Sequence, residues 1–465
     1  MKGLNVAMKK SGIWKLVLGV AVIATVLGTS CFADNPIVQT SFTADPAPLV
    51  HGDTVYLYTS HDEDDATGFK MFNWMCYSTK DMVNWTDHGI IAGVREPYKT
   101  FKWADGVNAW APACIERNGK FYLYCPFPYK GKMAIGVAVS DNPTGPFVDP
   151  IGKPLIYRGN DGDFDPAVFI DDGQAYLYWG GNGPCYYVKL NEDMISVSGD
   201  IQIASIDFTG TPREASYTEG PWLWKKNNRY YLAWASRCCP EGIGYAISDS
   251  PTGPWKCMGT IMDPNRLSDG NHPGIIDFKG MSYVFGFNYT LNWEMAGIKR
   301  ERRSVCVAEM TYNPDGTIRK VSWWTPEGVA QVGVFNPYRQ VEAATICHEN
   351  GVKTKPRGGD KRGVYVNVTE NGAYIKIKGV DFGDRVATNF LASVAAVTDG
   401  ATIVLRLDSE TGIPIGILKV KSTGALDQWE IQSCKITGAR GVHDLYLKFF
   451  GSGTPLQNLD WWKFE

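Results

Sequence analysis

The sequence predicts an all-β protein, a five-bladed β-propeller followed by a β-sandwich of the jelly-roll type, and three observations lead to this prediction. The 465 residues include 50 Gly and 26 Pro, which interrupt long helices and favour turns. Aromatic residues make up 13% of the chain, more than a plain helical bundle uses. One short pattern also repeats along the first two thirds of the chain, as expected for a repeat architecture.

The N-terminal segment is basic and then apolar, which is the pattern of a secretory signal peptide. Four lysines precede the apolar run 16–28, and small residues follow as far as Ala33. We therefore expect residues 1–33 to be a signal peptide and the protein to be exported, either periplasmic, extracellular or anchored at the cell surface through a lipid on Cys31. The apolar run is too short to span a bilayer, which takes about 20 residues, so we expect no integral membrane segment.

The composition excludes some classes of partner. The formal net charge of -3 provides no electrostatic reason to bind nucleic acid, and a neutral ligand suits it better. The 11 cysteines are scattered without a dense cluster, so a disulfide scaffold is not the main design. The vicinal pair Cys238 and Cys239 is the unusual feature among them. We expect the protein to be a monomer.

The repeat consists of a Pro, a short apolar run, a polar turn and a Tyr ten residues after the Pro. The five copies are Pro46 with Tyr56, Pro112 with Tyr122, Pro166 with Tyr176, Pro221 with Tyr231, and Pro273 with Tyr283. Each copy is typical of a β-hairpin. Five similar units of about four strands favour a propeller over residues 34–335, since radial repetition leaves no long exposed edges.

Residues 336–465 lack this repeat. They carry short alternating strands separated by Gly-containing turns, for example residues 373–378 and 402–407. The spacing of these strands predicts a β-sandwich as a second domain.

Acidic residues stand beside three of the repeat prolines. Asp45 and Asp165 directly precede their Pro, Glu219 lies two residues before its Pro, and His272 occupies the position in the fifth copy. Equivalent positions of a propeller converge on one face, so these side chains should lie together. Three convergent carboxylates indicate either glycoside hydrolysis or a divalent metal site. An inverting glycosidase uses an acid and a base about 6.5–9.5 Å apart, whereas a metal site would need more ligands than His272 adds.

Three tryptophans lie near repeat positions. Trp110, Trp103 and Trp222 are candidates for stacking on sugar faces, and core packing is the competing interpretation for each of them.

The sequence from about residue 35 to 335 resembles glycoside hydrolase family 43. The matching motifs are Ala44-Asp45-Pro46-Ala47-Pro48, Trp110-Ala111-Pro112, Asp165-Pro166-Ala167-Val168, Tyr217-Thr218-Glu219-Gly220-Pro221 and Asn271-His272-Pro273-Gly274. The resemblance implies a five-bladed propeller and single-displacement hydrolysis with inversion. It also implies roles for individual residues: Asp45 as general base, Glu219 as general acid, Asp165 as the residue that tunes and orients the acid, Arg303 as a substrate-side arginine, and His272 as a channel histidine facing a water-bound calcium.

The C-terminal part resembles carbohydrate-binding module family 6, most clearly at residues 441–447. Trp429 and Asn458 lie near the positions where relatives contact sugar, but Leu426 and Val368 stand where further aromatic rings are usual. Either sugar binding or a purely structural docking role is therefore open for this domain. Glu342 is a candidate ligand of a structural calcium, as in related modules. No cofactor is expected to be required for the chemistry.

These observations predict an exported, exo-acting glycosidase that removes terminal pentose residues from plant polysaccharides such as arabinoxylan or from xylo-oligosaccharides. Residues 60–66 and 74–78 most resemble the branch of the family that acts on arabinoxylan, so α-L-arabinofuranosidase activity is placed first. β-D-Xylosidase or dual activity is the alternative. A non-catalytic glycan-binding protein is a further alternative, which the complete set of acidic residues disfavours.

Overall fold

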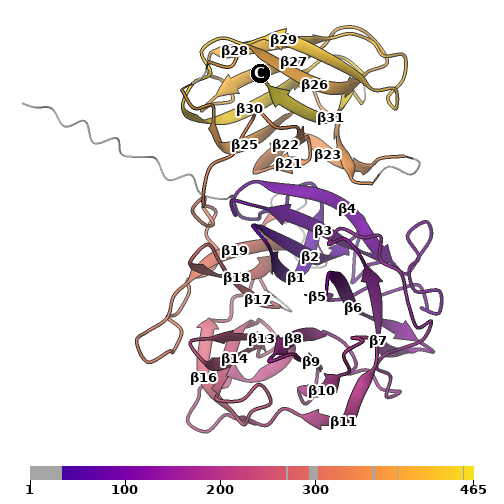
Figure 1. Cartoon of the computed structure of the whole chain (residues 1–465), viewed down its shortest axis with the longest axis vertical. Coiled ribbons are helices and arrows are strands. Elements are labelled where there is room, and N and C mark those ends of the chain that lie inside the picture. The colour runs from indigo at the N-terminus through magenta and orange to yellow at the C-terminus, as the bar shows by residue number, and fades with distance from the viewer. Residues whose placement is uncertain (1–33, 269–270, 293–301, 359–361, 385, 454) are drawn as a thin grey trace, which may run out of the picture. The chain divides into compact units, whose positions relative to one another are not determined.

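The chain consists almost entirely of β-strands, as Figure 1 shows. This computed structural model describes residues 34–268, 271–292, 302–358, 362–384, 386–453 and 455–465, so the predicted signal peptide lies outside the described residues. The prediction of an all-β protein is confirmed. In the part of the chain that the structure describes, no helix has both the length and the apolar character needed to cross a membrane.

Five antiparallel sheets follow one another along the first two thirds of the chain. The first holds β1 (Phe42–His51), β2 (Thr54–Asp62), β3 (Asn73–Thr79) and β4 (Trp85–Gly93), and the second holds β5 (Ala113–Arg117), β6 (Lys120–Tyr129) and β7 (Lys132–Ser140). The third holds β8 (Ala167–Asp171), β9 (Gln174–Trp179), β10 (Tyr186–Leu190) and β11 (Val197–Ile203). The fourth holds β13 (Tyr217–Lys226), β14 (Arg229–Ser236), β15 (Gly242–Ser248) and β16 (Trp255–Met262). A short strand, β12 (Ile206–Asp207), pairs with β16 in parallel, and a 3-10 helix, Arg213–Ala215, precedes β13. The fifth holds β17 (Gly274–Phe278), β18 (Met281–Asn288) and β19 (Ser304–Met310).

The predicted hairpins are the first two strands of each sheet. Four of their turns have two consecutive residues with positive φ, at Asn118-Gly119, Asp172-Gly173, Asn227-Asn228 and Lys279-Gly280. Such turns match the right-handed twist of paired strands and favour Asn, Asp and Gly, which explains why the polar turn recurs in the sequence.

The first strands of the five sheets contact one another in chain order. β1 contacts β5, β5 contacts β8, β8 contacts β13, β13 contacts β17, and β17 contacts β1. This is the order of neighbours that the predicted propeller requires.

Apolar side chains are buried between each pair of neighbouring sheets. Separate clusters join the first sheet to the second, the second to the third, the third to the fourth, the fourth to the fifth, and the fifth to the first. Fully buried aromatic side chains, among them Trp74, Trp179 and Trp234, are part of these clusters. Their burial removes much apolar surface from water and holds the first strands in place around the site.

The remaining strands form two facing sheets. One has the order β23 (Val352–Pro356), β24 (Val364–Val368), β31 (Gln457–Phe464), β26 (Asn389–Ala395) and β29 (Glu430–Lys435), and β20 (Val341–Glu342) also pairs with β31. The other has the order β22 (His348–Asn350), β25 (Tyr374–Asp381), β30 (Val442–Phe450), β27 (Ala401–Leu407) and β28 (Pro414–Val420). A single buried cluster draws residues from both sheets, as in a sandwich.

The sandwich residues are joined to the first sheet by hydrogen bonds. β21 (Thr345–Ile346) pairs with β4. The buried Asn84 amide donates to the Lys378 carbonyl at 2.9 Å and accepts from the Lys378 backbone N–H at 2.8 Å. These hydrogen bonds hold residues of the sandwich against the first sheet, which supports the structural docking role considered for the sandwich. The exact domain boundary after residue 335 stays a prediction.

Candidate active site

Asp45 and Asp165 share an unusual backbone conformation. Asp45 precedes Pro46 within β1, Asp165 precedes Pro166 just before β8, and their φ angles are 54° and 58°. Positive φ is uncommon for residues other than glycine and costs of order 1 kcal/mol or more. At Asp45 the register of β1 shifts between Ala44 and Ala47, which marks a β-bulge. In both sheets a positive φ at the residue before the Pro therefore orients the aspartate side chain.

Glu219 lies on an irregular part of β13. The register with β14 shifts on both sides of Glu219. Gly220 has a φ of 63°, and a Cβ there would lie 2.9 Å from Cδ2 of His272. Glycine at this position lets the imidazole lie against the backbone beside the acid.

The His272 imidazole contacts all three predicted carboxylates. Its Nδ1 lies 3.9 Å from Oδ1 of Asp45, and its Nε2 lies 2.9 Å from Oδ2 of Asp165 and 3.7 Å from Oε1 of Glu219. Asp45 therefore faces one ring nitrogen, while Asp165 and Glu219 face the other. The four side chains form one cluster, which we call the carboxylate cluster.

Burial and charge shift the pKa values in the carboxylate cluster. Burial raises the pKa of Asp165 to about 7, although the neighbouring His272 opposes the shift. Burial by itself lowers the pKa of His272, but the negative charges of Asp165 and Asp45 outweigh burial and raise that pKa well above its usual value. A protonated imidazole thus provides the positive charge that lets several acids lie close together.

Arg303 is a second cation beside the cluster. Its Nη1 donates to Oδ1 of Asp45 at 3.0 Å, and its Nε and Nη2 donate to the two oxygens of Asp62, each at 3.0 Å. All three side chains are buried. Asp45 also accepts a hydrogen bond from the Ser60 hydroxyl. Asp62 did not emerge from the sequence because it lies outside the repeat position, at the end of the second strand.

The carboxylate cluster and Arg303 line a cavity of about 320 Å³. That volume is in the lower range for small-ligand sites and suits a single sugar residue. The lining residues are Asp45, Phe69, Met71, Trp110, Phe164, Asp165, Asn182, Glu219, Cys238, Cys239, Glu241, His272, Tyr289 and Arg303. Phe69, Phe164, Asn182, Glu241 and Tyr289 were not predicted, because they lie on connections whose course only the fold determines.

The three predicted tryptophans lie in different places. Trp110 lines the cavity, and its buried Nε1 has no hydrogen-bond partner among the residues that the structure describes, which leaves a donor for a ligand. Trp222 does not line it: the indole donates to the Ile275 carbonyl at 2.9 Å and packs among apolar residues. Trp103 does not line it either, since its indole donates to Asp149 at 2.7 Å beside a different cleft. For Trp222 these contacts favour the competing interpretation of core packing, and stacking of Trp103 and Trp222 on a sugar stays a prediction.

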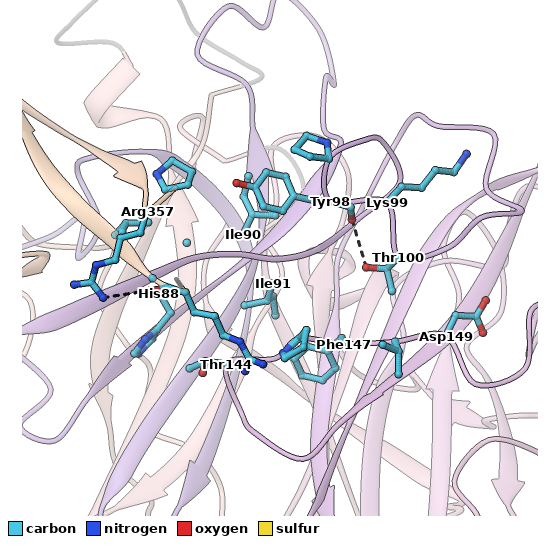
Figure 2. Close-up of a pocket in the computed structure, with 18 of the residues that line it drawn as sticks. His88, Ile90, Ile91, Tyr98, Lys99, Thr100, Thr144, Phe147, Asp149 and Arg357 are labelled. Atoms are coloured by element: carbon cyan, nitrogen blue, oxygen red, sulfur yellow. Dashed lines mark hydrogen bonds between the residues drawn. The ribbon is translucent and has the colours of Figure 1, made fainter. Parts of the chain in front are cut away.

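The cleft beside Trp103 is larger, about 1100 Å³, but holds none of the carboxylate cluster. Figure 2 shows its lining, with His88 and Ile90 from β4, the segment around Tyr98 and Thr100, the segment from Thr144 to Asp149, and Arg357. Asp149 accepts from the Trp103 indole and from two backbone N–H groups, so it is already engaged. Since this cleft lacks a pair of acids, we assign the chemistry to the smaller cavity.

In the sandwich, Trp429 lies edge-on to Tyr365, with ring centroids 5.3 Å apart. Tyr365 was not predicted. The close edge-on contact leaves no room for a sugar between the two rings. Asn458 is 1% exposed, donates to the Leu426 carbonyl at 2.8 Å and accepts from Asn367 at 2.7 Å. Contrary to the expectation, the Asn458 amide is engaged inside the protein and is not presented to a ligand.

The two predicted calcium positions, at Glu342 and at His272, have different surroundings. Arg357 lies where an ion beside Glu342 would bind: its guanidinium contacts the Glu342 carboxylate and donates to Oδ1 of Asp460 at 2.6 Å. At His272, ligand atoms of Asp165, Glu219 and the imidazole all lie within 4.8 Å of one another, which is a grouping that could hold a metal ion. The calcium predicted there stays a prediction. Calcium prefers six to eight oxygen ligands.

The contacts of Arg357 lead to a prediction about stability. Arg357→Ala removes charged hydrogen bonds to Glu342 and Asp460, and we expect it to lower the free energy of unfolding by about 1–3 kcal/mol. Chelation with EDTA should leave the difference in unfolding temperature between Arg357→Ala and wild type unchanged. Thermal unfolding of both proteins with and without EDTA measures both effects. A difference between the two proteins that EDTA changes and added calcium restores would place a calcium ion beside Glu342, against the ion pair with Arg357.

The raised pKa of Asp165 leads to a prediction about pH. The unfolded carboxyl, with a pKa near 3.8, ionises earlier than the folded one, so the contribution of Asp165 to stability is present below pH 4 and is lost as the pH rises toward 7. His272 acts in the same direction at higher pH, because its folded pKa is raised. We therefore compare the free energy of unfolding of Asp165→Asn with that of wild type. The value for the variant minus the value for wild type should rise from pH 5 to pH 8, by an amount on the order of 1 kcal/mol or more. Urea unfolding at both pH values measures this difference, and an equal difference at both would contradict it.

The geometry described so far, with two or more carboxylates around one imidazole in a sugar-sized cavity, defines the site of a glycosidase-type hydrolase. Comparison with known families agrees: residues 33–318 match the model of the glycosyl hydrolases family 43, and residues 342–465 match that of the carbohydrate binding module family 6. The chain belongs to glycosyl hydrolases family 43 and is a glycosidase.

Relatives cover most of the chain. An arabinoxylan arabinofuranohydrolase of Paenibacillus polymyxa is 35% identical over 92% of this chain and 74% of its own length. An arabinoxylan arabinofuranohydrolase of Bacillus subtilis (strain 168) is 32% identical over 96% of this chain and 94% of its own. The crystal structure of the family 43 arabinoxylan arabinofuranohydrolase from Bacillus subtilis, in complex with cellotetraose, superposes with a TM-score of 0.81, at 32% identity, over 94% of this chain and 99% of that chain.

Proposed function

We propose that this protein is an exported, inverting hydrolase that removes α-L-arabinofuranosyl residues from arabinoxylan. The observation that carries the proposal is the contact of one imidazole, that of His272, with Asp45, Asp165 and Glu219. The substrate class is supported by the names of the two bacterial relatives that align with most of this chain.

In the proposed reaction Glu219 is the general acid. Its side chain is 21% exposed, the most accessible in the carboxylate cluster, so it can reach the leaving-group oxygen of a bound glycoside. Protonation of that oxygen allows the glycosidic bond to break without forming a free alkoxide.

Asp45 is the proposed general base. Its carboxylate accepts hydrogen bonds from Arg303 and Ser60, which fix its orientation in the cavity. Asp45 faces Nδ1 of His272, whereas Glu219 faces Nε2. The proposed base and the proposed acid therefore lie on different sides of the ring. This separation suits a water molecule that attacks the anomeric carbon while Asp45 accepts its proton.

Asp165 and His272 are proposed as positioning residues. The ion pair between them, at 2.9 Å, holds the imidazole, and the imidazole in turn contacts the acid and the base. Trp110, with its unpaired indole N–H in the wall of the cavity, is proposed to donate a hydrogen bond to a sugar hydroxyl.

The function is tested by hydrolysis of an aryl α-L-arabinofuranoside and an aryl β-D-xyloside by the purified protein lacking residues 1–33, and by release of arabinose from arabinoxylan. We expect arabinose release, with the anomer that first appears in the proton NMR spectrum inverted relative to the substrate. Faster hydrolysis of the xyloside would favour the β-D-xylosidase alternative. Net retention of configuration would overturn the single-displacement mechanism.

We further infer that the five sheets close into a five-bladed propeller. The contact between β17 and β1, and the apolar cluster that joins the fifth sheet to the first, support closure. The basic and then apolar pattern of residues 1–33 supports export. N-terminal sequencing of the protein isolated from its host tests the cleavage. Sedimentation equilibrium tests the proposed monomer.

A further inference from the structure

The wall of the cavity that comes from the fourth sheet includes a disulfide bond. Cys238 and Cys239, which are adjacent in the sequence, are joined to each other, and both line the cavity. Both are exposed, whereas the other described cysteines are free thiols that are buried or half-buried. A disulfide that faces the carboxylate cluster calls for an explanation that core packing does not provide.

The loop that carries the disulfide is fixed beside the acid. It joins β14 to β15, and Ala235 near the end of β14 pairs with Glu219 on β13. At its start the Arg237 backbone N–H donates to the Ser216 carbonyl at 3.0 Å. At its end the buried Glu241 accepts from the backbone N–H of Asn271, next to His272, at 2.8 Å. The sulfur atoms are therefore held at a defined place relative to the reacting groups.

The chemistry of this wall differs from that of the rest of the cavity. The fourth sheet and its loop contribute two acids, Glu219 and Glu241, and the disulfide. Aromatic rings such as Phe69, Trp110 and Phe164 line the cavity from connections outside the fourth sheet. A disulfide has no N–H or O–H to donate, so it offers an apolar surface between two acids that attract hydroxyl groups. A sugar presents both kinds of surface, hydroxyls at its rim and C–H groups on its faces.

We propose that the Cys238–Cys239 disulfide is a specificity-determining part of the substrate site, which packs against a C–H face of the sugar whose leaving oxygen Glu219 protonates. This inference rests on the proposed function and adds one consequence. Substrate affinity depends on the redox state of the pair. Reduction by a phosphine breaks the S–S bond with two electrons, two protons complete the thiols, and the phosphine becomes a phosphine oxide with oxygen from water.

The test compares the oxidised and the phosphine-reduced protein, with EDTA present because the freed thiols and Glu241 could bind trace metal. We expect reduction to raise KM for the aryl arabinofuranoside about five- to tenfold and to change kcat less than twofold. The variant Cys238→Ala/Cys239→Ala should have the raised KM without reductant and should not respond to it. Cys434→Ala, which removes a half-buried thiol in the sandwich, should respond like wild type.

Mass spectrometry after alkylation confirms that the pair is reduced, and the unfolding temperature shows whether the fold persists. An unchanged KM in the fully reduced, folded protein would overturn the proposal, as would an equal loss of kcat and gain of KM in the alanine variant. If the wild-type protein hydrolyses neither pentoside, the proposed function fails. The redox proposal is then judged by calorimetry with an arabinoxylan oligosaccharide, where reduction should raise Kd by the same factor, and an unchanged Kd would refute it.

Discussion

Glu219→Gln is expected to lower kcat by about 10²–10⁴-fold on natural arabinoxylan while Kd for the sugar stays within a fewfold of wild type. The amide keeps the size of the side chain but has no proton to transfer to the leaving oxygen. The loss should shrink when the leaving group is a good one, such as dinitrophenol, because that group needs no protonation. Initial rates on a series of aryl arabinofuranosides of decreasing leaving-group pKa measure this dependence.

The matched control for this experiment is Glu192→Gln. Its side chain is 96% exposed and does not line the cavity, so the kinetics of this variant should equal those of wild type. Near-wild-type turnover of Glu219→Gln on arabinoxylan would refute the assignment of the acid.

Asp45→Asn is expected to lower kcat by at least about 10²–10⁴-fold on all substrates, whatever the leaving group. The proton that the base accepts comes from the attacking water, so the quality of the leaving group cannot compensate for the loss. Arg303 keeps its contacts with Asp62 in this variant, so we expect the protein to remain folded. Rates on the same aryl series, with circular dichroism as the check on folding, measure the effect.

The two variants together separate acid from base. A steep recovery with good leaving groups in Glu219→Gln and a flat profile in Asp45→Asn are the expected pair of results. The reverse pattern would exchange the two roles, and flat profiles in both would place neither residue in proton transfer to the leaving group.

The repeat explains why so much of the fold was predictable. A Pro, an apolar run, a polar turn and a Tyr are local features, and each determines a hairpin without help from distant residues. Because equivalent positions of repeated units converge, the register of the prolines also placed Asp45, Asp165, Glu219 and His272 together before any distance was known.

Other features of the site depend on long-range contacts. Asp62 binds Arg303, which is 241 residues away, and no local pattern distinguishes it from other strand-end acids. The same holds for the tryptophans: Trp110 lines the cavity while Trp222 packs among apolar residues, although both lie close to repeat prolines. Which face of a strand meets the cavity depends on bulges and on neighbouring sheets.

The sequence by itself determined the all-β class, the number of repeated units and the residues of the carboxylate cluster, because these follow from local periodicity and from the equivalence of repeats. Only the tertiary structure decided which cations hold the acids, where the Cys238–Cys239 disulfide lies, and that Arg357 stands between Glu342 and Asp460. These are pairings between distant segments, and the energy of a charge or a polar group depends on the neighbours and the burial that the complete fold provides.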